Sequence, residues 1–83
     1  MDNEKILVAI NFLKELEADT QIPKNIKLRL GQTIKTLEQN SEISIKVSRA
    51  LSELEDLTED ANMQPFTRTQ LFNIVSMLEM ASS

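Results

Sequence analysis

Residues that interrupt helices are scarce in this chain, and their scarcity limits its possible folds more than any other feature. The 83 residues include one glycine, Gly31, and two prolines, Pro23 and Pro65. Short strands are joined by turns rich in such residues, and no segment shows the strict alternation of apolar and polar residues that marks a half-buried strand. We therefore predict an all-α protein.

Apolar residues recur at spacings of three and four in four successive segments, which places those of each segment on one face of an amphipathic helix. The stripes are Ile6, Ala9, Ile10, Leu13 and Leu16; Ile26, Leu30, Thr33, Ile34 and Leu37; Ile43, Val47, Ala50, Leu51, Leu54 and Leu57; and Leu71, Ile74, Val75 and Leu78. Four such helices in a short chain predict a four-helix bundle with one core.

Capping residues predict where these helices begin and end. Pro23 and Pro65 suit the first turn of the second and fourth helices, where a missing N–H is not needed. Asn40 suits a left-handed residue after the second helix, and Ser41 suits the N-cap of the third. We therefore expect a tight link and antiparallel neighbours.

The second half of the chain resembles the first after a shift of 41 positions. Identical pairs include Ala9/Ala50, Leu13/Leu54, Leu16/Leu57, Asp19/Asp60, Leu30/Leu71 and Leu37/Leu78, and Lys27/Arg68 is a conservative pair. Asp19/Asp60 and Lys27/Arg68 are polar and are not required by an apolar stripe. We therefore predict an internal duplication: one domain, 1–83, of two tandem antiparallel hairpins, residues 2–42 and 43–83.

Composition narrows the possible functions. The chain has neither cysteine nor histidine, which removes thiolate chemistry and the commonest general base. Its formal net charge of -4 disfavours general binding to nucleic acid or anionic membranes. The longest apolar run, Ile6 to Ile10, is far too short to span a bilayer. We expect a soluble, cytoplasmic protein that needs no cofactor.

Charged residues gather near the predicted turns. Asp19 with Lys27 and Asp60 with Arg68 are acid and base pairs eight residues apart, and we predict that each pair staples its own turn. Carboxylates also cluster at Glu15, Glu17 and Asp19 and at Glu53, Glu55, Asp56, Glu59 and Asp60. Solvated helix faces explain these clusters better than a calcium or magnesium site, because the spacing of a calcium loop is missing.

Basic residues offer a second alternative. Lys24, Lys27 and Lys35 share one side of the second helix, and Lys46 and Arg49 lie on the third. Together they could contact phosphates, although few aromatic residues are available to stack on bases.

Several apolar residues fall outside the core stripes, among them Leu7 and Val8. The three that best suggest a partner or self-association surface are Leu28, Ile45 and Phe72. A wide apolar face on an inner helix would also explain Leu28 and Phe72, so both interpretations stay open for them. Met77 and Met80 could form a soft partner-binding edge.

The segment Pro65 to Glu79, together with Ile22 to Ile26, resembles the small archaeal proteins of uncharacterised protein family 0147. The resemblance spans nearly the whole chain. It implies a helical bundle in an archaeal, cytoplasmic setting and implies no activity. Family members place an arginine where Lys27 stands and an aromatic residue where Phe72 stands.

No constellation for catalysis, phosphate binding or metal binding emerges from these patterns, so we predict a protein that is not an enzyme. A helical interaction or structural module, binding another protein or itself, is the leading hypothesis. A nucleic-acid-associated protein and a divalent-metal-binding carboxylate protein are the alternatives.

Overall fold

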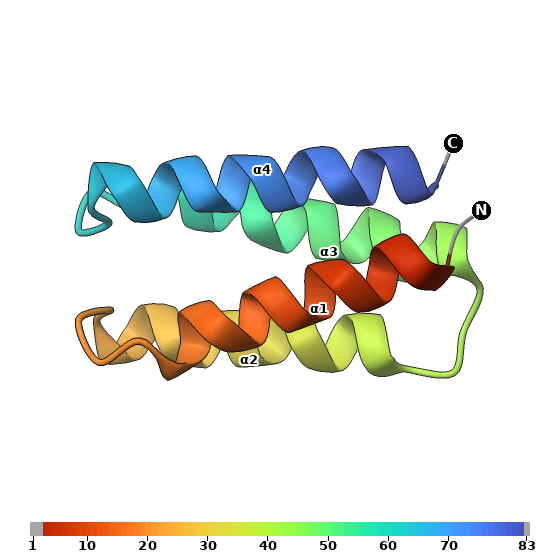
Figure 1. Cartoon of the computed structure of the whole chain (residues 1–83), viewed down its shortest axis with the longest axis horizontal. Helices are drawn as coiled ribbons and strands as arrows, with labels where there is room; N and C mark the ends of the chain where they lie inside the picture. Colours follow the sequence, from red (N-terminus) through yellow and green to blue (C-terminus); the bar gives the residue numbers. More distant parts are fainter. Residues whose placement is uncertain (1–2, 83) are drawn as a thin grey trace.

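The computed structural model describes residues 3–82 as four α-helices. The helices are α1 (Asn3–Ala18), α2 (Lys24–Glu38), α3 (Ile43–Thr58) and α4 (Pro65–Ala81). Each helix packs on two neighbours, so the four form a ring in chain order that closes between α1 and α4. Adjacent helices are antiparallel, and the turns of both hairpins lie at one end of the bundle (Figure 1). The predicted all-α four-helix bundle is confirmed.

The core consists of the four predicted stripes. Ile43, Leu51 and Val75 are partly exposed and pack against its edge, whereas every other stripe residue is buried. Two turn residues 41 positions apart, Ile22 and Met63, complete the core at the hairpin-turn end. The result is an elongated bundle of 32 × 19 × 18 Å.

The two hairpin turns carry matching hydrogen bonds. The Gln21 N–H donates to Asp19 Oδ1 over 2.9 Å, and the Asn62 N–H donates to Asp60 Oδ1 over 2.8 Å. In the same way, the N–H groups of Ile22 and Met63 donate to the carbonyl oxygens of the two aspartates. Each aspartate therefore holds its turn in the same Asx conformation. The duplication stays a prediction, but the two turns are built alike.

The link between α2 and α3 differs from its prediction. No non-glycine residue within 3–82 has a positive φ, so Asn40 is not left-handed. The link runs through Gln39 and Glu42, which are both extended, and Glu42, not Ser41, is the N-cap of α3. An extended backbone carries the chain from one helix across to its neighbour, which an immediate reversal at Asn40 would not do. The Lys46 Nζ lies 3.4 Å from the Gln39 carbonyl oxygen, so a cation caps the end of α2 instead.

The prolines lie close to their predicted places. Pro65 is the first residue of α4, as predicted. Pro23 is the N-cap of α2 and therefore precedes the first turn by one residue. Both helices begin at matching positions of the two halves, Lys24 and Pro65.

Candidate functional site

Arg68 binds the turn of the second hairpin through carbonyl oxygens rather than through a carboxylate. Its Nε donates to the Thr58 carbonyl oxygen over 2.9 Å, and its Nη2 donates to the Asp60 carbonyl oxygen over 2.9 Å. A third, longer bond of 3.5 Å reaches the Met63 carbonyl oxygen. The guanidinium thus satisfies the Thr58 carbonyl, which the end of α3 leaves without a helical partner, and adds a donor to two carbonyl oxygens of the turn. The predicted pair meets, but through the backbone of Asp60.

The Asp60 carboxylate turns elsewhere. One oxygen accepts the turn N–H described above, and the other lies 3.9 Å from Arg29 Nη1 of α2. In the first hairpin, no hydrogen bond or ion pair joins Lys27 to Asp19 in the part of the chain that the structure describes. The predicted staple at this turn is therefore wrong. A lysine presents a single nitrogen, whereas the planar fork of arginine reaches several carbonyls at once.

The acidic helix ends do not converge. Within residues 3–82, no three acidic side chains lie close enough together to hold a metal ion. Asp19 and Asp60 use a carboxylate oxygen to accept turn N–H groups instead.

The basic residues do not form one surface either. Lys24, Lys27 and Lys35 line a hollow between α1 and α2, but Glu17 and Glu38 line the same hollow. Lys46 lies on α3 and contacts the end of α2. Carboxylates among the lysines weaken the local positive potential that a phosphate backbone requires.

The apolar residues singled out from sequence are exposed, but they are scattered. Leu28, Ile45 and Phe72 are 64%, 50% and 53% exposed and belong to α2, α3 and α4. Leu28 lies in the second turn of α2 and Ile45 in the first turn of α3, at opposite ends of the bundle (Figure 1). They do not share one continuous binding surface.

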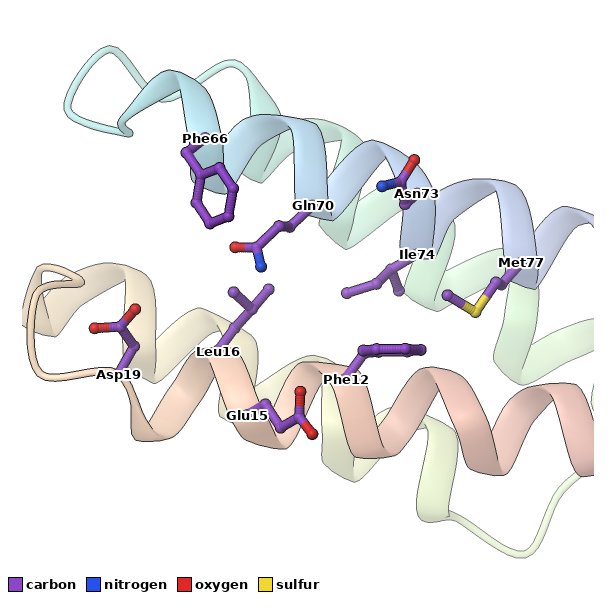
Figure 2. A pocket seen from close by; sticks show the side chains of 9 residues that line it. All are labelled: Phe12, Glu15, Leu16, Asp19, Phe66, Gln70, Asn73, Ile74 and Met77. Carbon is purple, nitrogen blue, oxygen red and sulfur yellow. The ribbon is translucent and has the colours of Figure 1, made fainter.

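An apolar surface lies instead between the first and last helices. Figure 2 shows this feature, which we call the α1/α4 groove. It encloses about 270 Å³ and is lined by Phe12, Glu15, Leu16, Asp19, Phe66, Gln70, Asn73, Ile74 and Met77. Ile74 and Met77 point toward Phe12 across the groove, whereas Phe66 lies at the hairpin-turn end near Asp19 (Figure 2). Phe66 is 72% exposed and Phe12 is 43% exposed.

The matching face of the other half carries a polar pair in place of the apolar one. When the two halves of the sequence are aligned at a shift of 41 positions, Phe12 corresponds to Glu53 and Met77 corresponds to Thr36. The Thr36 hydroxyl donates to Glu53 Oε2 over 3.3 Å between α2 and α3. Across the α1/α4 groove, two apolar side chains occupy these positions. The two faces of the bundle therefore share a framework but differ in chemistry.

Sequence reasoning missed Phe12 and Phe66, although it singled out Met77. The signal was available in the repeat: Phe12 matches Glu53 and Phe66 matches Asn25. Both halves form the same hairpin. An apolar residue whose matching position in the other half is polar is therefore not required by that fold. Such positions mark a surface that only one half carries.

Within residues 3–82, no helix combines the length and the apolar character needed to cross a bilayer. The groove is lined by apolar side chains together with two carboxylates and two amides. Such a lining suits an apolar ligand surface better than it suits a reaction, because no nucleophile and base are paired in it.

Comparison with known proteins agrees with the fold and with the resemblance noted in the sequence. A UPF0147 protein of Sulfurisphaera tokodaii is 38% identical over 80 residues, which cover 94% of this chain and 90% of that protein. A UPF0147 protein of Thermoplasma volcanium, TV0625, is 32% identical over 81 residues, covering 95% and 90%. The solved structure described as "Crystal structure of unknown function protein MMP1188" has a TM-score of 0.88 and 32% identity, covering 95% of this chain and 91% of that one. The profile of the Uncharacterised protein family (UPF0147) matches residues 1–81, and the chain belongs to this archaeal family.

Proposed function

We propose that this protein is a non-enzymatic interaction module that binds an amphipathic helix in the α1/α4 groove. One observation carries the proposal: Phe12 and Phe66 are exposed on the face whose counterpart carries a polar pair, Thr36 and Glu53. Apolar groups gathered on the surface of a small protein mark an interaction site.

The energy gained by covering these residues is substantial. Full burial of a phenylalanine side chain contributes about 1.5–3 kcal/mol relative to exposure. Aromatic residues that enter a pocket on a partner also dominate the energy of protein interfaces. Met77, beside Phe12, has an unbranched side chain that adapts to the shape of whatever binds.

The edges of the groove define the chemistry of its occupant. Glu15 and Asp19 line it on the α1 side, Gln70 and Asn73 line it on the α4 side, and no cation lines it. A complementary helix therefore presents an apolar stripe flanked by lysine or arginine. The apolar stripe supplies affinity, and the charges set the orientation.

Two features support a function other than catalysis. The sequence contains neither cysteine nor histidine, and no nucleophile and base are paired in the groove. A groove with exposed aromatic side chains is suited to recognition of a protein surface.

The test compares two double variants that remove the same number of exposed apolar side chains. Phe12→Ser/Phe66→Ser changes the groove, whereas Leu28→Ser/Ile45→Ser changes exposed residues elsewhere. Each tagged chain is used to capture proteins from archaeal extract, with and without nuclease treatment. Each protein captured after nuclease treatment is then purified and titrated against all three chains.

We expect the groove variant to weaken binding by about 30-fold or more, as the loss of one interface anchor typically does. The control variant should change the affinity less than about twofold, which corresponds to less than 0.5 kcal/mol. Equal binding by the groove variant and the wild type would refute the proposal. Capture that occurs only without nuclease would favour nucleic-acid association through the basic residues.

A further inference from the structure

We infer that the α1/α4 groove packs against the same groove of a second copy, with α1 opposite α1 and α4 opposite α4, so that the protein forms a two-fold symmetric dimer. This inference rests on the proposed function, because it names the occupant of the same groove. The supporting observation is the charge pattern of α1. Along the side that faces the groove, the charges of one α1 helix are complementary to those of a second, antiparallel α1 helix.

One stripe of α1 and its following turn faces the groove. Phe12, Glu15 and Asp19 line the groove. The same alternation of three- and four-residue steps, continued toward the start of the helix, reaches Val8 and then Lys5. Val8 is 45% exposed. The stripe thus begins with a cation, continues with two apolar residues and ends with two carboxylates.

This stripe is complementary to itself when two copies run antiparallel. The midpoint between Val8 and Phe12 is also the midpoint between Lys5 and Glu15. A two-fold axis at this point therefore places Val8 opposite Phe12 and Lys5 opposite Glu15 of the second copy. Each contact occurs twice, as an isologous interface requires.

A parallel pairing of the same stripe is disfavoured. It would place Lys5 opposite the second Lys5 and Glu15 opposite the second Glu15. Like charges that face each other across an interface suppress the wrong arrangement. The charges of α1 therefore select the antiparallel arrangement, and the apolar pair between them supplies the buried area.

The other wall of the groove fits this axis. Met77 lies across the groove from Phe12 (Figure 2), so an axis beside Phe12 passes close to Met77 as well. Two copies then bring their Met77 side chains together near the centre of the interface. Methionine suits such a place because its flexible side chain fills irregular gaps.

The face is large enough for a stable contact. One side of the bundle measures 32 by 19 Å. A standard protein interface covers about 800 Å² of accessible surface on each partner, and the accessible area of a ridged helical face exceeds its flat projection. Interfaces of this size bind with Kd values from about micromolar downward.

The matching stripe of α3 provides a control. It consists of Lys46, Arg49, Glu53, Asp56 and Asp60, so charges replace the two central apolar residues. Exposed ion pairs alone contribute about 0–1 kcal/mol each, which does not hold two proteins together. The α1 stripe therefore carries the dimer contact, and Asp56 is the counterpart of Glu15 for a matched substitution.

The test measures the mass of the full chain by sedimentation equilibrium. We expect a dimer at about 100 µM, given the affinity typical of such an interface. Glu15→Lys and Lys5→Glu should each raise the dimer Kd about 10-fold or more, since each turns two attractive contacts into repulsive ones. The double variant Lys5→Glu/Glu15→Lys keeps the net charge of the wild type and should restore dimerisation. Asp56→Lys on α3 should leave the dimer Kd within about twofold of the wild type.

A wild-type chain that stays monomeric at about 1 mM would overturn the inference, because interfaces of this size are saturated there. A dimer that is indifferent to Glu15→Lys, or is not restored by the double variant, would also overturn it. Circular dichroism of each variant verifies that the bundle is folded. A monomeric wild type whose groove variant still loses a captured partner would leave the proposed function standing, so the two failures are distinguishable.

Discussion

Replacing Arg68 with lysine tests how the second hairpin turn is held. The change preserves the positive charge and removes the planar guanidinium group. It gives the second turn the same residue type, lysine, that the first hairpin has at the matching position, Lys27. Two of the Arg68 hydrogen bonds are 2.9 Å long and reach different carbonyl oxygens, those of Thr58 and Asp60. A single ammonium nitrogen cannot keep the positions of both Nε and Nη2, so at least one of these two hydrogen bonds is lost.

The size of the effect follows from the bond that is lost. A hydrogen bond with a charged partner contributes about 1.5–3 kcal/mol, and the half-buried setting of Arg68 favours the lower part of that range. We therefore expect Arg68→Lys to lower the free energy of unfolding by about 2 kcal/mol. For a domain of this size, that corresponds to a fall in Tm of about 8–16 °C.

Urea and thermal unfolding followed by circular dichroism measure this change, with Lys27 as the internal control. Lys27→Ala should change stability by less than about 0.5 kcal/mol, as is usual for surface substitutions. Lys27→Arg should stabilise the protein by about 1 kcal/mol if the first turn accepts the same fork. An Arg68→Lys protein within about 0.5 kcal/mol of the wild type would refute the assignment of turn stability to these bonds.

Two further predictions concern the hairpins. Gly31→Ala places a Cβ 2.6 Å from Glu17 Oε2, the mobile end of a side chain that can move aside. The free energy of unfolding, measured in urea, should therefore rise by about 0.5–1 kcal/mol, because alanine favours a helix more than glycine does. A loss of stability would show that Glu17 is held rigidly. Asp60→Ala should cost about 1–2 kcal/mol and more than Asp19→Ala, because the Asp60 carboxylate also faces a cation from α2. Equal Tm values for the two alanine variants would contradict that ranking.

The two faces of the bundle explain why a repeated sequence need not have a repeated function. The α2/α3 face carries a polar contact between Thr36 and Glu53. The α1/α4 face keeps the same helix geometry and replaces those side chains with Phe12 and Met77. Differences between the two halves at a few outward positions therefore leave the core intact and give the two faces different chemistry.

Local patterns predicted the helices and the core because those features depend on nearby residues. Periodic apolar residues identify the buried face of each helix without knowledge of its neighbours. The same local reasoning failed at Asn40 and Ser41, where propensity suggested a tight reversal. The distance between α2 and α3 decided that link, and it required extended residues at Gln39 and Glu42.

The partners of the charged residues also depended on tertiary structure. A spacing of eight residues placed Asp60 and Arg68 at the same turn, but it did not reveal that Arg68 binds carbonyl oxygens. Nor did it show that the Asp60 carboxylate lies close to Arg29 of the other hairpin. Contacts between hairpins have no signature in local spacing.

The sequence by itself determined the fold class, the four helices and the identity of most buried residues, because periodic apolar residues must be covered in any compact arrangement. Which outward residues gather into one surface was decided only when α1 packed against α4. Leu28, Ile45 and Phe72 stood out in the sequence and lie apart in the structure, whereas Phe12 and Phe66 line one groove. Residues 54 positions apart contribute to the same groove because the ring of helices closes, and that closure is a property of the packed core.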